Sequence, residues 1–287
     1  MNKFAIDFVG VGPQRTGTTW LYRMLRAHPA LCLPQDVKET MFFDRRYQKG
    51  KGWYAWHFRH CEEAGLFGEV APTYFDSEEA RIRLQAHNPA ARVIVTLRDP
   101  AERAFSLYLH HRRKGRVRGT FREAVARIPR IIEAGHYARH VPGWMKAFGR
   151  DHVHFVLLED IKARPERTLE RLYTFLGVSP AEASSAVAEE KVNATTMTRF
   201  PRLARAAAAL ATKLRARRLH RLVEWGKRLG LKRVFASGSE AKIPELSPDE
   251  RQELTATYAC DIAYVEEMLG RDLAGWSRAV NESSSER

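Results

Sequence analysis

Residues 4–27 read FAIDFVGV, GPQRTG and TTWLYRMLRA, and these three parts decide the fold. The apolar run over residues 4–11 predicts a buried strand, and Leu21, Met24 and Leu25 share one face of a predicted helix over residues 18–27. The loop between them, residues 12–17, has a glycine at each end and an arginine inside. Backbone N–H groups in such a loop, together with the dipole of the following helix, can hold a phosphate group. The stretch therefore predicts a phosphate loop, for which a purely structural turn is the alternative.

Strand and helix patterns alternate along the sequence that follows. Short apolar runs at residues 31–33, 66–70, 93–97 and 153–158 predict four more strands. Predicted helices cover residues 77–86, 100–113, 121–127, 138–148 and 165–176, and Gly177 ends the last of them. Because strands that alternate with helices form parallel sheets, we predict a P-loop-containing three-layer α/β fold whose central parallel sheet is flanked by helices.

The strand pattern stops near residue 194. Residues 194–242 are rich in Ala, Leu and Arg, and they predict a C-terminal helical lobe or lid. Ser247 and Glu250 have the spacing of a capping box, with Pro248 at the first helical position, so a helix is expected from there to about Leu269. We therefore predict one domain over residues 1–276 and a disordered tail over residues 277–287.

Composition limits the class of protein. With 287 residues, 44% of them hydrophobic and 29% charged, the chain can bury a substantial core. No run approaches the roughly 18 apolar residues that span a membrane, and the N-terminus shows no signal pattern, so a cytoplasmic protein is expected. Cys32, Cys61 and Cys260 are an odd number of cysteines without C-x-x-C spacing, which argues against a disulfide framework and against a cysteine zinc site. A reducing compartment is expected from this pattern.

The formal net charge of +14 is concentrated in two segments. Residues 199–233, from Arg199 to Arg233, hold twelve basic residues and one acidic residue. Amphipathic helices with a solvated basic face are one interpretation of this segment. Peripheral contact with a membrane or an anionic glycan is another, because basic helices that carry Leu and Trp suit such an interface. Nucleic acid is not expected as a partner, since aromatic residues for base stacking are sparse. The second basic segment comprises Arg112, Arg113, Lys114, Arg116 and Arg118.

A second strand-to-helix junction follows residues 93–97. Arg98 comes directly after the strand, and Ser106 lies about two turns into the next helix. Together they can hold a second phosphate group beside the first; alternatively, Asp99 only caps the helix beside solvated arginines. A nucleoside triphosphatase has a lysine where Thr18 stands, and a strand such as this one normally ends in its magnesium-binding aspartate. Both departures count against a P-loop kinase or ATPase.

The two junctions together resemble the 5′-phosphosulfate loop and the 3′-phosphate motif of sulfotransferases that use 3′-phosphoadenosine 5′-phosphosulfate (PAPS). KETMFFD at residues 38–44, WY at 53–54 and GEVAPTYF at 68–75 are similar to segments of heparan-sulfate-type and bacterial carbohydrate sulfotransferases. The resemblance extends roughly from Phe4 to Leu176. It implies transfer of the sulfuryl group of PAPS to a hydroxyl of a saccharide or glycoconjugate. The implied product is 3′-phosphoadenosine 5′-phosphate (PAP), and no metal is expected.

The resemblance also implies a role for each matching residue. Glu39 matches the general base, and Arg15 matches the loop lysine that stabilises charge on the bridging oxygen. A guanidinium keeps its proton, which leaves open whether Arg15 also protonates the leaving group. The implied nucleotide-binding residues are Gln14, Arg15, Thr16, Gly17, Thr18, Thr19, Arg98, Ser106 and Tyr137. The implied acceptor-binding residues are Lys38, Asp44, Glu69 and Tyr74. For Tyr137, a place in the core is the alternative.

The general base has alternatives as well. Glu39 can instead be a surface carboxylate paired with Lys38, and surface pairs of this kind are common and weak. Glu69 and the histidines are the other candidate bases. His110 and His111 are expected on the solvated face of their helix.

Two departures from the family pattern concern the acceptor. Val70 stands where heparan enzymes have lysine, and Met41 stands where some have histidine. Both weaken the case for a heparan-like substrate, so a phenolic or alcohol natural product is the alternative acceptor. A non-catalytic basic protein that binds nucleic acid or a membrane is a more distant alternative.

Overall fold

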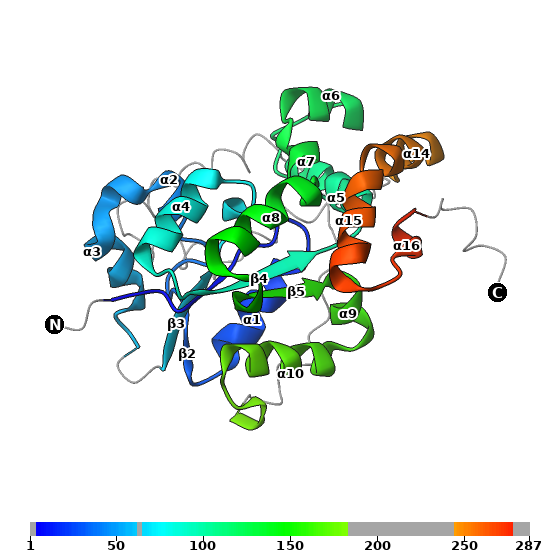
Figure 1. Cartoon of the computed structure of the whole chain (residues 1–287). Coiled ribbons are helices and arrows are strands. Elements are labelled where there is room, and N and C mark those ends of the chain that lie inside the picture. Colours follow the sequence, from blue (N-terminus) through cyan, green and yellow to red (C-terminus); the bar gives the residue numbers. More distant parts are fainter. Residues whose placement is uncertain (1–3, 62–64, 183–243, 278–287) are drawn as a thin grey trace, which may run out of the picture.

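Five parallel strands form the centre of the computed structural model, which describes residues 4–61, 65–182 and 244–277. Their order across the sheet is β2-β3-β1-β4-β5, and each neighbouring pair is parallel (Figure 1). The strands are β1 (Phe8–Gly10), β2 (Leu31–Cys32), β3 (Leu66–Val70), β4 (Arg92–Leu97) and β5 (Val153–Leu157). The predicted central parallel sheet is therefore confirmed, although β1 takes up only three residues of the strand predicted over residues 4–11.

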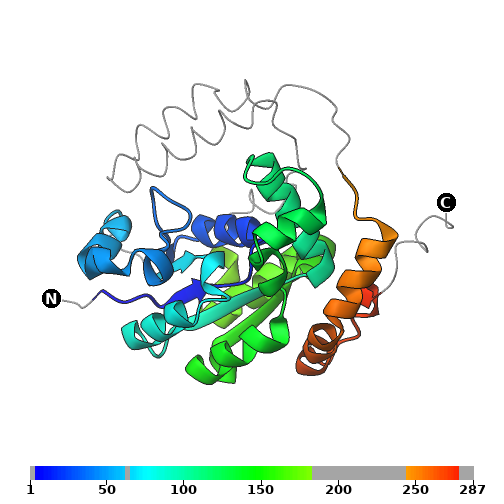
Figure 2. The same cartoon turned by 90° about the horizontal axis from the view of Figure 1, so that it is seen from above.

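Helices cover both faces of this sheet and complete a three-layer α/β fold (Figures 1 and 2). Alternate strand residues enter different cores: Phe8 and Ile94 pack on one face, and Val9, Val93 and Val95 pack on the other. The first face is covered by α1 (Thr18–Ala27), α9 (Leu158–Ala163) and α10 (Pro165–Leu176). The second is covered by α4 (Glu78–His87), α5 (Pro100–Arg113), α8 (Tyr137–Phe148) and α15 (Ala259–Leu269).

Shorter helices surround these layers. They are α2 (Phe42–Arg45), α3 (Gly50–Ala55), α6 (Phe121–Arg127), α7 (Arg130–Glu133), α14 (Pro248–Thr257) and α16 (Ala274–Ser277). Single 3-10 turns occur at Tyr47–Lys49, Trp56–Phe58, Pro72–Tyr74, Arg150–His152 and Pro180–Glu182. In Figure 2, α14 and α15 lie together at one side of the molecule, where α14 contacts α5 and α15 contacts α8.

The helix predicted from Ser247 to Leu269 is in fact two helices. The predicted capping box is present, but α14 ends at Thr257 and α15 starts at Ala259. Tyr258 lies between them, fully buried, and its hydroxyl donates to the Ile132 carbonyl at 2.9 Å. A long-range contact of this kind leaves no periodic signal in the sequence, so the break was missed.

Other expectations concern segments outside the described residues. The predicted helical lobe over residues 194–242, the basic segment from Arg199 to Arg233 and the tail beyond residue 277 all fall there. Within residues 4–61, 65–182 and 244–277, no helix combines the length and the apolar character needed to cross a membrane.

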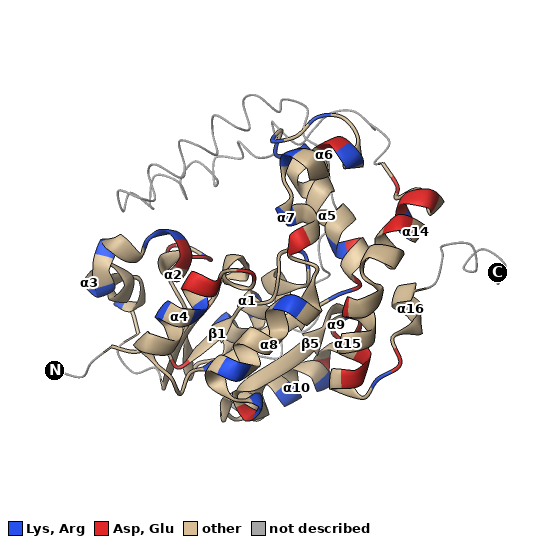
Figure 3. Cartoon of the chain, turned by 45° about the horizontal axis from the view of Figure 1, so that its top comes forward, with Lys and Arg blue, Asp and Glu red and all other residues tan. Residues whose placement is uncertain are grey.

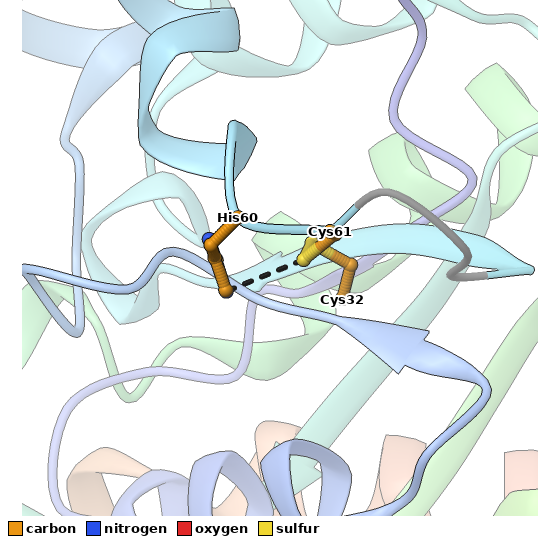
Figure 4. A group of neighbouring side chains, drawn as sticks. All are labelled: Cys32, His60 and Cys61. Carbon is orange, nitrogen blue, oxygen red and sulfur yellow. Dashed lines mark hydrogen bonds between the residues drawn. A yellow bond between two sulfur atoms is a disulfide. The ribbon is translucent and has the colours of Figure 1, made fainter.

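Cys32 and Cys61 form a disulfide, which corrects the expectation drawn from the cysteine count (Figure 4). Cys32 is the last residue of β2, Cys61 follows the turn at Trp56–Phe58, and their Cα atoms are 6.0 Å apart. His60 Nε2 lies 3.2 Å from the Cys61 sulfur. The same three side chains have metal-ligand spacing, but the two sulfurs are bonded to each other and are not free thiolates. The expected reducing compartment therefore loses its support from the cysteine pattern.

Removing this disulfide is expected to cost about 2–4 kcal/mol of unfolding free energy, because the bond closes a loop of 29 positions in the unfolded chain. The change is Cys32→Ser with Cys61→Ser, measured by denaturant unfolding without reductant. Cys260→Ser is the matched control, because Cys260 is a free, exposed thiol. Equal stability of the double variant and the control would contradict a structural role for the bond.

Candidate active site

The site lies between β1 and β4, where the order of the strands in the sheet reverses. β1 and β4 pair side by side, but the chain runs from β1 to β2 on one side of the sheet and from β4 to β5 on the other. In open α/β sheets, ligands bind in the crevice beyond the carboxyl ends of strands at such a point. The loop of residues 12–17 follows β1, and Arg98 follows β4. The two phosphate-binding junctions predicted from the sequence are therefore neighbours.

Gly12 allows the loop to lie against β4. A Cβ atom at this position would be 2.1 Å from the Thr96 hydroxyl oxygen and 2.4 Å from the Thr96 backbone nitrogen, so no larger residue fits. Thr16 donates its hydroxyl hydrogen to the Pro13 carbonyl at 2.6 Å, and its oxygen also lies 2.6 Å from the Thr96 hydroxyl oxygen. Since each hydroxyl has one hydrogen, Thr96 is the donor in the second bond. Buried contacts thus fix the loop to the strand.

The loop ends in a left-handed turn that leads into the N-terminus of α1. Arg15 and Gly17 adopt left-handed φ angles of 79° and 94°. Glycine accepts this conformation readily, whereas an arginine there is strained in a way that is concentrated at ligand sites. α1 begins at Thr18 without a side-chain cap, so the N–H groups of its first turn and its dipole can bind an anion. The predicted cradle residues lie in this turn (Gln14, Thr16 and Gly17) and at the start of α1 (Thr18 and Thr19).

Two arginines and a serine from the two junctions come together. Arg15 Nε donates to Ser106 Oγ at 2.9 Å, and Arg98 Nη1 donates to the Arg15 carbonyl at 3.4 Å. Burial and then the charges of Arg113 and Arg98 lower the pKa of Arg15 to about 10, which still leaves it protonated at neutral pH. A partly buried cation whose pKa is lowered by neighbouring cations is stabilised by a bound anion. Ser106 and Arg98 are therefore well placed to share such an anion with Arg15.

Tyr137 lies in the core, as the alternative prediction had it. Its side chain is fully buried, and its hydroxyl donates to the Arg98 carbonyl at 2.7 Å. Burial raises the pKa of Tyr137, so the phenol stays neutral. The residue therefore holds the backbone of Arg98 in place and leaves no exposed surface for direct contact with a nucleotide.

Asp99 does cap α5, but the arginines beside it are not solvated. Its carboxylate accepts from the N–H groups of Ala101 at 2.9 Å and Glu102 at 3.2 Å. Arg251 on α14 donates to the same carboxylate at 2.5 Å and to the Trp276 carbonyl at 3.0 Å. The sequence predicted the start of the helix that carries Arg251, but gave no signal for this buried contact. The C-terminal helices therefore support the junction that holds Arg98.

Lys38 and Glu39 lie beside the start of α1. Lys38 Nζ is 3.5 Å from Thr18 Oγ1, 3.4 Å from Thr19 Oγ1 and 3.4 Å from Glu39 Oε1. The side chains of Lys38 and Glu39 are 27% and 21% exposed. Burial lowers the pKa of Lys38, and the neighbouring Glu39 partly opposes this shift. Glu39 does pair with Lys38, which was the alternative prediction for it. The pair is partly buried beside the phosphate loop, however, and is not a fully exposed surface pair.

Glu69 and Tyr74 form buried hydrogen bonds with Thr40, the residue after Glu39. Both side chains are fully buried. Glu69 accepts hydrogen bonds from Thr40 Oγ1 at 2.7 Å, from the Tyr74 hydroxyl at 2.7 Å and from the Tyr54 hydroxyl at 2.9 Å. Burial raises the pKa of Glu69, although these bonds oppose the rise. Glu69 and Tyr74 are therefore placed to fix Thr40, next to Glu39, and their contact with an acceptor stays a prediction.

Asp44 on α2, also predicted to contact the acceptor, is largely buried and pairs with Arg45 at 3.5 Å. Its side chain is 8% exposed. This contact is local to α2, and the contact of Asp44 with an acceptor stays a prediction.

His110 and His111 are not on a solvated face, which corrects that expectation. His111 is buried, and His110 is half-buried with its Nδ1 atom 3.4 Å from Arg113 Nη2. Burial and nearby cations, Arg15 first among them, lower the pKa of His110 to about 3. A ring that binds protons so weakly is a poor general base at neutral pH. The basic segment begins in the last turn of α5 and continues toward α6 (Figure 3), and the charge of its Arg113 acts on Arg15.

A family model described as "Sulfotransferase domain" matches residues 6–215, which include both junctions. Human bifunctional heparan sulfate N-deacetylase/N-sulfotransferase 2 is 32% identical over 195 residues, 60% of this chain and 22% of the relative. Mouse bifunctional heparan sulfate N-deacetylase/N-sulfotransferase 1 is 33% identical over 193 residues, 59% of this chain and 22% of the relative. The chain thus spans about a fifth of the length of these relatives.

The fold has a solved counterpart. A sulfotransferase from Alicyclobacillus acidocaldarius superposes with a TM-score of 0.69 at 24% identity, and the match covers 96% of this chain and 100% of that one. This similarity shows a shared fold. Because the family model also covers most of the chain, including the phosphate loop and the Arg98 junction, the chain belongs to the sulfotransferase domain family.

Proposed function

We propose that this chain transfers the sulfuryl group of PAPS to a saccharide or glycoconjugate acceptor. The observation that carries the proposal is the meeting of Arg15, Arg98 and Ser106 at the ends of two adjacent strands. PAPS has an anionic group at each end of its ribose, the 5′-phosphosulfate and the 3′-phosphate. The loop and the N-terminus of α1 suit the first group, and Arg98 with Ser106 suits the second.

The chemistry needs positioning, a base and a stabilised leaving group. The acceptor atom attacks sulfur as Glu39 takes its proton, and the bond between sulfur and the bridging oxygen breaks with its electron pair left on that oxygen. Arg15 stabilises the negative charge that develops on the phosphate side. The sulfated acceptor and PAP are the products, and no further reactant is required.

The acceptor atom is a hydroxyl in the prediction from the sequence. The relatives reported above are named N-sulfotransferases of heparan sulfate, which supports an amine of a saccharide as a second candidate. In either case a base at the position of Glu39 is needed, because an amine is protonated at neutral pH and a hydroxyl is a weak nucleophile. A phenol or alcohol natural product remains the alternative for the same chemistry.

Radiolabelled PAPS separates these acceptors. The wild type would be incubated in parallel with heparin stripped of its N-sulfo groups, with heparin stripped of its O-sulfo groups and with a simple phenol. We expect label in one of the two saccharides, and no release of phosphate when Mg-ATP replaces PAPS. Transfer to the phenol alone would overturn the saccharide part of the proposal. Hydrolysis of Mg-ATP, with no use of PAPS, would overturn the proposal as a whole.

A further inference from the structure

We propose that Lys38 is a second catalytic cation, which contacts the sulfuryl group as it passes from the bridging oxygen to the acceptor. This inference rests on the proposed function and assigns a residue to its central step. The family resemblance implied that Lys38 binds the acceptor. The residues adjacent to Lys38 in the sequence do not indicate that it contacts the phosphate loop.

The position of the ammonium group carries the inference. Lys38 Nζ lies within 3.5 Å of Thr18 and Thr19 at the anion-binding start of α1 and within 3.4 Å of the Glu39 carboxylate. One side of this cation therefore faces the place of the 5′-phosphosulfate, and the other faces the base that receives the acceptor proton. The sulfur atom must travel between these two places during an in-line transfer.

The backbone on both sides of Lys38 is held in place. Asp36 pairs with Arg59 at 3.1 Å, and the Gln35 N–H donates to the His57 carbonyl at 3.2 Å. On the other side, Thr40 is bonded to the buried Glu69 at 2.7 Å. A residue between two such anchors keeps its position when a ligand binds, which is a requirement for electrostatic stabilisation of a transition state.

Arg15 alone does not account for stabilisation of the sulfuryl group. Its Nε atom is bonded to Ser106 on α5, so that side of its guanidinium is directed toward the Arg98 junction. A guanidinium is also a poor proton donor, because it keeps its proton at neutral pH. Lys38 is the more suitable group: burial lowers its pKa and Arg15 adds to this effect, while Glu39 opposes it. Its ammonium gives up a hydrogen bond or a proton more readily than an exposed lysine does.

The ion pair between Lys38 and Glu39 couples the two halves of the reaction. When Glu39 accepts the proton of the acceptor, its carboxylate becomes neutral and no longer holds the ammonium group. At the same moment, negative charge appears on the bridging oxygen as its bond to sulfur breaks. The ammonium can then donate to that oxygen, so the loss of one partner coincides with the gain of another.

The test compares Lys38→Met, Lys38→Arg and the control Lys51→Met, since Lys51 is an exposed lysine on α3. PAP affinity is measured by calorimetry, and turnover is measured with PAPS and the saccharide that the wild type sulfates. Removing a group that stabilises the transition state lowers kcat by about 10²–10³-fold, so we expect this loss for Lys38→Met with PAP affinity changed far less. Wild-type kcat in Lys38→Met would overturn the inference, as would a loss of PAP binding that accounts for the whole effect.

The pH profile of Lys38→Arg gives a readout that a structural role would not affect. In the wild type, activity should fall at high pH as Lys38 loses its proton, and its lowered pKa brings this fall to lower pH. An arginine stays charged, so the fall should move to higher pH with kcat partly restored. An unmoved high-pH limb would count against Lys38. Failure of the wild type to bind PAP would instead refute the proposed function itself.

Discussion

Glu39→Gln is expected to lower turnover by about 10²–10⁴-fold while PAP affinity stays close to that of the wild type, because a positioned base contributes about this much to a proton transfer. A glutamine has nearly the same shape but cannot accept the acceptor proton. Glu39 is partly exposed and pairs with Lys38, which contacts the start of α1, whereas Glu69 is fully buried. Steady-state kinetics with PAPS and the saccharide that the wild type sulfates measure turnover, and calorimetric titration of PAP measures nucleotide affinity.

Two controls make this prediction specific. Glu79→Gln changes an exposed carboxylate on α4 that pairs with Arg83, so its kcat should equal that of the wild type. His110→Gln removes the rival base, and because the pKa of His110 is held at about 3, its loss should not remove the base of the reaction. Full turnover in Glu39→Gln, or a larger loss in His110→Gln, would assign the base elsewhere.

Arg251→Met is expected to lower the free energy of unfolding by about 3–5 kcal/mol, the usual cost of removing one partner from a buried ion pair. The side chains of Arg251 and Asp99 are only 5% and 7% exposed, and they are 2.5 Å apart. Methionine fills similar space but leaves the Asp99 carboxylate without its cation. Urea unfolding followed by circular dichroism measures the loss.

The matched control is an exposed ion pair between α6 and the helix that carries Arg251. Arg122 on α6 pairs with Glu253 on α14 at 3.0 Å, but these side chains are 85% and 63% exposed. Exposed pairs contribute about 0–1 kcal/mol, so Arg122→Met should be nearly neutral. If both variants lost the same stability, the buried pair would have no special role. Because Asp99 caps α5 beside Arg98, Arg251→Met should also weaken PAP binding at temperatures where the protein remains folded.

Local signals in the sequence predicted much of the fold. The helices at Pro100–Arg113, Phe121–Arg127 and Pro165–Leu176 were predicted with their observed bounds. Each has a local marker: Asp99 caps the first, Thr120 and Glu123 form a capping box on the second, and Gly177 ends the third with a left-handed φ. Such markers act over a few residues, so they can be read without knowledge of the packing.

Contacts between distant segments could not be predicted in this way. Cys32 meets Cys61 because the chain between them returns to β2, and Arg251 meets Asp99 across 152 positions. The place of Lys38 at the start of α1 likewise depends on how the segment after β2 packs on the loop. That the two predicted junctions lie at the same edge of the sheet was predictable, because alternating strands and helices indicate a parallel sheet and both motifs follow the carboxyl ends of strands.

The central claim is that the site recognises the 3′-phosphate of a PAPS-type nucleotide, and calorimetric titration tests it without knowledge of the acceptor. Wild-type protein would be titrated with PAP, with 5′-AMP and with Mg-ATP, and Arg98→Ala with PAP. We expect tight binding of PAP, much weaker binding of the other two, and a loss of roughly 10- to 100-fold in Arg98→Ala, which is the effect of one charge-assisted hydrogen bond. Equal binding of PAP and 5′-AMP, or a preference for Mg-ATP, would contradict the assignment of this site.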